Sequence, residues 1–282
     1  MTHTFYITDV FAEEPYSGNQ LGTFVDAADI TTEEMQQIAR ELNFAETTFI
    51  TGGSLADGFD VRIFTPAAEL PFAGHPTLGT SFLIRNEILK NDIAVLTLNL
   101  GVGKIPVTFG DEGVLWMEQK APSFGEQIAV ETIAEELGLE PSDINGDYPA
   151  QPVSTGLEFL LIPLNSYRAL KKASVNEGKL AKGYFLFCKG GYNKTQSIQA
   201  RMFAQGLGVS EDPATGSANG CLASYMVEHK FLGTSEVNIT VGQGYEIGRP
   251  SQLYLRASKN GSEYEINVGG KVRLVASGEW RR

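Results

Sequence analysis

Three titratable side chains in this sequence stand where an acid–base reaction could use them: Glu46, His75 and Asp212. A carboxyl group or an imidazole held in a sheltered position can take a proton from one atom and return it to another. His75 and Asp212 each precede a proline and an uncharged stretch typical of a helix. These residue types indicate proton transfer, provided that the surrounding elements bring them together.

His75 belongs to the segment Phe-Ala-Gly-His-Pro-Thr-Leu-Gly, residues 72–79. Pro76 favours extended backbone at His75 and suits the first position of a helix. The unpaired N–H groups and the dipole of a helix N-terminus favour an anion. A histidine that merely caps the turn would also explain this pattern, so both interpretations stay open for His75 alone.

Asp212 lies in a segment of similar design, Glu-Asp-Pro-Ala-Thr-Gly-Ser over 211–217. An aspartate just before a helix is commonly a cap. Two helix N-termini, each preceded by a titratable residue and a proline, indicate more than capping. If both ends face one cleft, N–H groups around Gly74, Gly216 and Ser217 would bind a carboxylate, assisted by the Ser217 hydroxyl. The expected substrate is therefore a small anionic metabolite.

Glu46 stands between the end of a helix and the start of an apolar strand, in Asn-Phe-Ala-Glu-Thr-Thr-Phe-Ile over 43–50. It is either a solubilising charge at a strand edge or a carboxylate in a sheltered pocket. In the second case, loss of hydration would raise its pKa toward neutrality, which suits a general base or acid. Asp9 and Asn19 are further polar candidates, although a strand-end hydrogen bond would explain Asp9 and a turn would explain Asn19.

The elements that must position these residues are many short strands and four helices. Strands are expected where β-branched and aromatic residues run between turn signals, at residues 5–11, 22–25, 47–50 and 59–64. Apolar residues repeat at helical spacing over 31–42, where Thr31 and Glu34 fit a capping box, and again over about 130–137. The other two helices follow Pro76 and Pro213.

These last two helices lack a polar face, so each should be buried on all sides. Their glycine-rich starts are alike and lie about half the chain apart. We therefore expect an α+β fold of two similar halves, each a strand wrap around one central helix. The N-terminal domain would comprise residues 1–119 plus about 268–282, the C-terminal domain residues 120–267, with the active site between them.

Composition excludes several classes of function. The formal net charge of −12 and the scattered basic residues argue against a nucleic-acid partner. No apolar run approaches the roughly 20 residues that cross a bilayer, and no secretory signal is visible, so no membrane partner and a cytoplasmic location are expected.

Motifs for metals and cofactors are also missing from the sequence. Cys188 and Cys221 belong to no metal-ligand pattern, and the three histidines are far apart, so no metal is expected. Neither a dinucleotide-binding motif, nor a Walker-type motif, nor a Gly-x-Ser-x-Gly motif occurs. We therefore expect a reaction without a cofactor.

Together these segments resemble the PhzF-like (phenazine biosynthesis-like) family of the diaminopimelate epimerase-like fold, over nearly the whole chain. The motifs that carry the resemblance are Asp-Val-Phe…Gly-Asn over 9–19, Ala-Glu-Thr-Thr-Phe over 45–49, Arg-x-Phe-Thr-Pro over 62–66, Glu-x-Pro-Phe-Ala-Gly-His-Pro-Thr over 69–77 and Glu-Asp-Pro-Ala-Thr-Gly-Ser-Ala over 211–218. The resemblance implies two β/α-roll domains with the active site between them, and a homodimer.

The resemblance also implies roles for the candidate residues. Glu46 matches the catalytic glutamate of the family, with His75 and Asp212 as its acid–base companions. The positions that hold the substrate carboxylate match Gly74, Gly216 and Ser217, and Asn19 is a further substrate contact. The family often has proline after the Gly-Asn pair, whereas this chain has Gln20.

The implied reaction is a cofactor-independent isomerisation that moves a proton between carbon atoms of a small carboxylate-bearing metabolite. The alternatives are an epimerase, racemase or dehydratase acting on an amino or hydroxy acid, and a non-catalytic small-molecule binding protein. Epimerases and proline racemases of this fold use one cysteine from each half. Here Ala73 and the Pro213–Ala214 region occupy those neighbourhoods, which disfavours two-cysteine racemisation.

Overall fold

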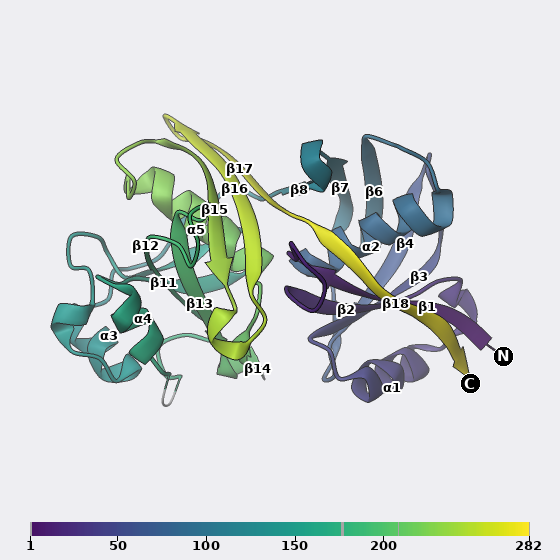
Figure 1. Ribbon diagram of the computed structural model, residues 1–282, viewed down its shortest axis with the longest axis horizontal. Coiled ribbons are helices and arrows are strands. Elements are labelled where there is room, and N and C mark those ends of the chain that lie inside the picture. The colour runs from purple at the N-terminus through teal and green to yellow at the C-terminus, as the bar shows by residue number, and fades with distance from the viewer. Residues whose placement is uncertain (1, 176–177, 208, 282) are drawn as a thin grey trace. The chain divides into compact units, whose positions relative to one another are not determined.

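The computed structural model describes residues 2–175, 178–207 and 209–281. The chain divides into two compact units: unit 1 comprises Met1–Met117 with Gly269–Arg282, and unit 2 comprises Glu118–Val268. Each unit combines strands with a few helices, so the expected α+β class is confirmed (Figure 1). Among the described residues, no helix is both long enough and apolar enough to span a bilayer.

Unit 1 is a strand wrap around one helix. Its strands are β1 (Thr2–Val10), β2 (Asn19–Phe24), β3 (Glu46–Ser54), β4 (Gly58–Phe64), β5 (Glu69–Leu70), β6 (Val95–Leu100), β7 (Gly103–Phe109), β8 (Leu115–Glu118, which ends at the unit boundary) and β18 (Val272–Arg281). Its helices are α1 (Thr32–Leu42), α2 (Gly74–Leu83), the π-helix η2 (Ile84–Leu89) that continues α2, and the 3₁₀ turns η1 (Ala27–Asp29) and η3 (Asp111–Gly113).

Unit 2 is built in the same manner. Its strands are β9 (Ser123–Phe124), β10 (Gln151–Ser154), β11 (Glu158–Pro163), β12 (Tyr184–Lys189), β13 (Ile198–Ala204), β14 (Val209–Asp212), β15 (Glu236–Gln243), β16 (Ser251–Asn260) and β17 (Glu263–Gly270). Its helices are α3 (Val130–Leu137), α4 (Tyr167–Lys172) and α5 (Gly216–Glu228), with the 3₁₀ turns η4 (Pro141–Asp143), η5 (Gln205–Leu207) and η6 (Tyr245–Ile247).

Strand pairing follows one pattern in both units. In unit 1, β1–β2 is antiparallel, β2–β3 parallel, β3–β4 antiparallel, β4–β6 parallel and β6–β7 antiparallel. In unit 2 the same alternation runs through β10–β11, β11–β12, β12–β13, β13–β15 and β15–β16. A short strand, β5 or β14, pairs with the fourth strand of each series and leads into the central helix. The expectation of two similar halves is therefore confirmed.

The two central helices are buried as predicted. Helix α2 contacts β1, β2, β3, β6, β7 and β18, and α5 contacts β10, β11, β15 and β16 (Figure 1). Small residues allow this enclosure: a Cβ atom on Gly79 would lie 2.6 Å from Leu21 Cδ2 and 2.8 Å from Val10 Cγ2. Strands can therefore approach α2 closely only because this position has no side chain.

The outer helices are amphipathic and were largely predictable. Helix α1 begins one residue after Thr31, whose hydroxyl caps it by accepting from Glu34 N at 3.3 Å. Its apolar side packs with Met35 and Ile38 against the sheet, in a core cluster that includes Phe49. Helix α3 has the predicted bounds, whereas the six-residue α4 was not predicted because it is too short to display a helical repeat.

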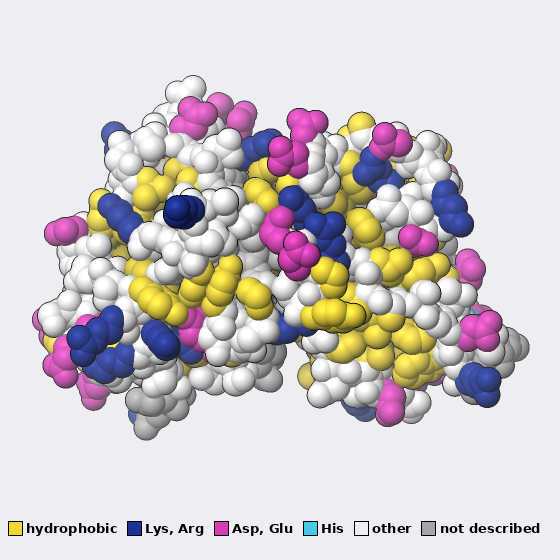
Figure 2. Space-filling view, viewed as in Figure 1, with side chains coloured by type: hydrophobic (Ala, Val, Ile, Leu, Met, Phe, Trp, Pro, Cys, Tyr) yellow, Lys and Arg dark blue, Asp and Glu magenta, His cyan; other side chains and the backbone are white. Residues whose placement is uncertain are grey.

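Hydrophobic side chains gather on the surface of unit 1 over β1 and β18 (Figure 2). These strands pair in antiparallel fashion along their whole length. Leu274 of β18 is 39% exposed, and Tyr6 of β1, which lies on the same face, is half-buried. This face of the β1–β18 pair therefore presents apolar side chains at the surface.

Candidate active site

Glu46 and His75 lie side by side in unit 1. Glu46 begins β3 opposite Leu21 of β2, and His75 is the second residue of α2. Glu46 Oε2 lies 3.5 Å from His75 Nε2, and the two side chains are 17% and 6% exposed. Glu46 is thus a sheltered carboxyl group and not a solvated charge at a strand edge.

Burial keeps His75 in its neutral form. Loss of hydration lowers its pKa to about 3, and a hydrogen bond to the backbone carbonyl of Gln20 opposes only part of that shift. Within the described part of the chain Nε2 has no hydrogen-bond partner, so Nδ1 is the nitrogen that donates to Gln20. Nε2 then presents a lone pair toward Glu46. The contact joins a neutral imidazole to a carboxyl group and is not an ion pair at neutral pH.

The departure from the family pattern at Gln20 leaves this contact intact. The Gln20 side chain is exposed, and only its backbone carbonyl meets His75. Proline has the same carbonyl, so either residue can serve. The interpretation of Asn19 as a turn residue is wrong, because it begins β2 opposite Val10 and is only 3% exposed. Asp9 accepts from Tyr16 N at 2.7 Å, which confirms the hydrogen-bonding interpretation of that residue.

Gly74 and His75 form the first turn of α2. Ala73 is the N-cap in extended backbone, and the Thr77 hydroxyl donates to the Ala73 carbonyl at 2.7 Å. The first N–H groups of a helix have no partner within it, and the helix dipole adds positive potential there. An anion at this end would therefore meet the amides of Gly74 and His75.

The second group of predicted residues lies in unit 2. Asp212 ends β14, and Gly216 and Ser217 are the first two residues of α5. The N-cap of α5 is Thr215, so the interpretation of Asp212 as the helix cap is wrong. Instead, the Thr215 hydroxyl donates a hydrogen bond to Asp212 Oδ2. This geometry orients the carboxyl group at the helix N-terminus.

Gln243, the last residue of β15, holds this turn and was missed by the sequence analysis. Its Nε2 donates to the Asp212 carbonyl at 2.8 Å and to Thr215 Oγ1 at 3.1 Å. Its Oε1 accepts from Thr215 N at 3.3 Å and from Asn219 Nδ2 at 3.0 Å. Gln243 is fully buried, and Asn219 also donates to the Thr215 carbonyl at 3.0 Å. One feature of the sequence could have indicated this contact: Asn219 is a polar residue inside an uncharged, buried helix, so its side chain needs a hydrogen-bond partner.

Replacing Gln243 by alanine is expected to destabilise unit 2. The change leaves buried donors and acceptors of Asp212, Thr215 and Asn219 unpaired, which costs roughly 2–4 kcal/mol. Urea unfolding measures this loss. Gln127→Ala, which alters an exposed glutamine of the same unit, is the matched control and should cost less than about 1 kcal/mol. Equal effects of the two changes would contradict the assignment of Gln243 to the turn.

His75 makes a testable contribution to the pH dependence of stability. Its folded-state pKa of about 3 lies below the unfolded value, so the unfolded chain binds this proton more readily at intermediate pH. The contribution of neutral His75 to the free energy of unfolding is fully present above about pH 6.5 and is lost as the pH decreases toward 3. The unfolding free-energy difference between the wild type and His75→Gln should shrink by about 2 kcal/mol from pH 7 to pH 5. A constant difference over that range would mean that His75 titrates normally.

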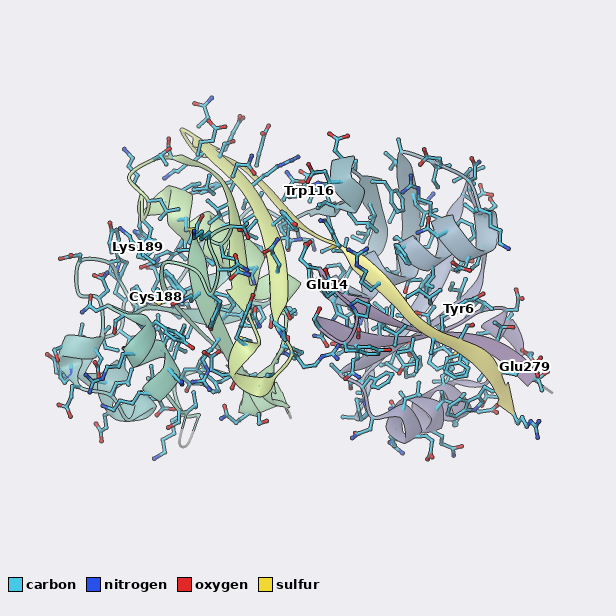
Figure 3. The ribbon with its side chains drawn as sticks, in the orientation of Figure 1. Tyr6, Glu14, Trp116, Cys188, Lys189 and Glu279 are labelled. Carbon is cyan, nitrogen blue, oxygen red and sulfur yellow. The ribbon has the colours of Figure 1, made fainter. Side chains whose placement is uncertain are left out.

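Neither cysteine is suited to act as a base. Cys188 of β12 is buried beside the exposed Lys189 (Figure 3), and Cys221 is buried inside α5. Loss of hydration raises their pKa values to about 12 and about 11. Ala73 is the N-cap of α2, and the Pro213–Ala214 region lies just before Thr215, the N-cap of α5, so neither neighbourhood carries a cysteine.

Comparison with known proteins assigns the chain to a family. A family model described as phenazine biosynthesis-like protein matches residues 8–278. The chain belongs to the phenazine biosynthesis-like family. Over 98% of each chain it is 33% identical to the trans-2,3-dihydro-3-hydroxyanthranilate isomerase of Pseudomonas aeruginosa. The chain is accordingly an isomerase that acts on a small molecule.

Solved structures agree with this family assignment. A PhzF-family phenazine biosynthesis protein of Bacillus anthracis is 29% identical, with full coverage of both chains and a TM-score of 0.89. A hydroxyproline epimerase of Agrobacterium vitis is only 8% identical but has a TM-score of 0.59, covering 99% of this chain and 92% of the epimerase. The expected diaminopimelate epimerase-like fold of two β/α-roll halves is therefore confirmed.

Proposed function

We propose that this isomerase moves a proton between two carbon atoms of a small, conjugated carboxylic acid by acid–base catalysis without a cofactor. The observation that carries the proposal is the contact between the sheltered Glu46 carboxyl group and the neutral His75 imidazole. A base that is shielded from water, with an acceptor beside it for its acid form, is suited to take and return the same proton.

In the proposed reaction, the Glu46 carboxylate takes a proton from a carbon that conjugation activates. The electron pair of the broken C–H bond enters the conjugated system, and Glu46 becomes a carboxylic acid. While protonated, Glu46 can donate a hydrogen bond to the lone pair of His75 Nε2. Glu46 then returns the proton to a different carbon, so that a new C–H bond forms and no electron is gained or lost.

The helix N-termini supply the electrostatic part of this proposal. Amides at Gly74, Gly216 and Ser217 would hold the substrate carboxylate and stabilise negative charge that develops in the conjugated system. Asn19 is a further candidate contact for the substrate. Asp212, oriented by Thr215, would relay or tune the proton on the second side of the substrate.

Each unit supplies groups that the other lacks, and the proposed reaction uses both sets. Unit 1 carries the carboxyl–imidazole pair, and unit 2 carries the aspartate with a hydroxyl-bearing helix start. We also propose a cytoplasmic homodimer, and the apolar sheet face over β1 and β18 supports self-association.

Turnover in deuterated water tests the proposed reaction. The first probe is trans-2,3-dihydro-3-hydroxyanthranilate, the substrate in the name of the Pseudomonas relative, followed by a panel of small conjugated carboxylic acids. We expect a product of unchanged formula in which deuterium enters at carbon. Inversion at one carbon would indicate an epimerase, and loss of water would indicate a dehydratase. Absence of carbon-bound deuterium in every product would contradict the proposal.

A further inference from the structure

A buried arginine–glutamate pair lies directly behind the Asp212 turn. Arg201 of β13 donates two parallel hydrogen bonds to Glu211 of β14, from Nε to Oε1 at 3.0 Å and from Nη2 to Oε2 at 2.8 Å. The two side chains are only 10% and 8% exposed. Such a two-pronged, charge-assisted contact fixes the relative position of the two strands as well as holding them together.

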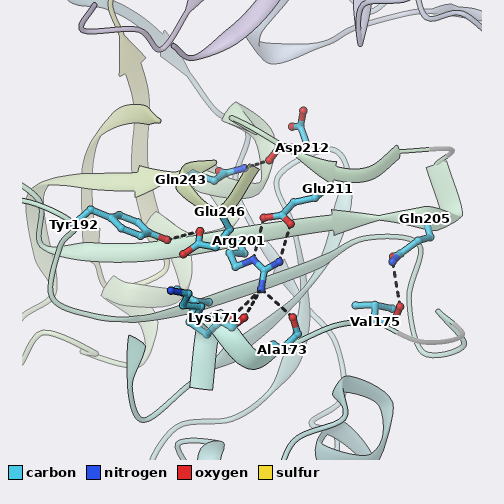
Figure 4. A network of polar contacts seen from close by, with 11 residues as sticks. Lys171, Ala173, Val175, Tyr192, Arg201, Gln205, Glu211, Asp212, Gln243 and Glu246 are labelled. Carbon is cyan, nitrogen blue, oxygen red and sulfur yellow. Dashed lines mark hydrogen bonds and ion pairs between the residues drawn. The ribbon is translucent and has the colours of Figure 1, made fainter. Parts of the chain in front are cut away.

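The remaining side of the Arg201 guanidinium binds the end of α4. Nη1 donates to the carbonyls of Leu170 at 3.0 Å, Lys171 at 3.3 Å and Ala173 at 2.9 Å (Figure 4). Unpaired carbonyls and the negative end of the dipole make a helix C-terminus a good site for a cation. Arg201 therefore joins β13, β14 and α4 through one planar group, a geometry that the point charge of lysine cannot reproduce.

Unit 1 has an arginine–glutamate pair at the equivalent place, where the two side chains are more exposed, at 30% and 41%. Arg62 of β4 donates two hydrogen bonds to Glu69 of β5, from Nε to Oε1 and from Nη2 to Oε2, each 2.7 Å long. Arg62 Nη1 donates to Thr32 Oγ1 at 2.9 Å, at the start of the outer helix α1. In each unit the arginine also lies over a phenylalanine ring two residues later, Phe64 or Phe203.

The position of the glutamates in the sequence gives these pairs a consequence for the active site. Glu69 and Glu211 stand the same number of residues before the first glycine of their central helices. Glu211 and Asp212 are neighbours on β14, and their carboxyl groups point to opposite sides of that strand (Figure 4). The hydrogen bonds from Arg201 to Glu211 thus fix the backbone that carries Asp212. The Asp212 side chain points away from Arg201 and stays available to the substrate.

We propose that the two arginine–glutamate pairs are positioning pairs for the proton-transfer groups. Arg201 and Glu211 set Asp212 and the first turn of α5, while Arg62 and Glu69 set the first turn of α2 with its His75. This inference rests on the proposed function for its catalytic consequence, but the positioning itself can be measured without a substrate.

Hydrogen–deuterium exchange of the intact protein tests the positioning. Arg201→Lys keeps the positive charge but cannot make the two parallel hydrogen bonds to Glu211. It should speed amide exchange in residues 211–219 about tenfold and leave the exchange rates of residues 69–78 unchanged. Arg62→Lys should show the reverse pattern. Lys259→Met is the matched control, because it removes the 2.6 Å contact between Lys259 Nζ and Glu228 Oε2 at the far end of α5. That control should alter neither segment.

Steady-state kinetics on a substrate that takes up deuterium at carbon separate a positioning role from a purely stabilising one. Arg201→Lys should lower kcat about tenfold through Asp212 and should also raise KM, because Gly216 and Ser217 in the same turn are proposed to hold the substrate carboxylate. A pair that only stabilises the fold would lower Tm and leave kcat of the folded enzyme unchanged. Glu211→Gln is the second variant if Arg201→Lys does not fold.

Equal exchange increases in both units, no increase in either, or an unchanged kcat in a folded variant would overturn the inference. Lack of turnover in the wild type on every probe would count against the proposed function alone. In that case the exchange pattern of the two segments still decides whether the pairs position the helix starts.

Discussion

Glu46→Gln is expected to lower kcat by about 10³–10⁴-fold and to stop the entry of deuterium at carbon. Glutamine keeps the size of the side chain, and its amide N–H can donate to the lone pair of His75 Nε2, so the fold should persist. The amide cannot take up the substrate proton at neutral pH, however, and the sheltered position next to His75 admits little water as a substitute base. Steady-state rates and mass spectrometry of the product measure both effects.

Two further variants sharpen this test. Glu46→Asp keeps a carboxylate but withdraws it by one methylene, and a displacement of about 1 Å can cost about 10²-fold in rate. Glu41→Gln changes an exposed glutamate on the nearby helix α1 and should leave the rate unaltered. If Glu46→Gln retained turnover and exchange, the base would have to be sought elsewhere.

Local patterns in the sequence predicted the elements whose burial repeats along the chain. The helical spacing of apolar residues gave α1 and α3, and the absence of charge after Pro76 and Pro213 gave the two buried helices. Each of these features depends on neighbours within a few turns, which a single sequence displays directly.

Contacts between distant segments could not be predicted in the same way. Glu46 meets His75 because the parallel register of β2 and β3 sets Glu46 opposite Leu21 while the Gln20 carbonyl holds the imidazole. Gln243 reaches the Asp212 turn only because β15 pairs with β13. Register is fixed by packing across the whole sheet, and no local signal in this sequence specifies it.

The repeated architecture also explains why the two halves contribute different chemistry. Both units provide a glycine-led helix N-terminus behind an arginine–glutamate pair, so the scaffold for holding an anion occurs twice. The side chains at equivalent places differ: Ala73 and His75 in unit 1 correspond to Thr215 and Ser217 in unit 2. Common geometry with different titratable groups suits a reaction that takes and returns a proton at two distinct carbon atoms.

Asp212→Asn is expected to lower kcat by about 10²–10³-fold, because the amide can no longer accept or relay a proton. Thr215→Val removes the hydroxyl that donates to Asp212 Oδ2 and should cost about tenfold, since the carboxyl group stays but loses its orientation. In the double variant the two losses should not multiply, because the Thr215 hydroxyl acts through Asp212.

Ser217→Ala, at the same helix start, serves as the comparison: its loss should appear mainly in KM and multiply with that of Asp212→Asn. Fully multiplicative losses for Asp212 and Thr215 would show that Thr215 acts on the substrate independently.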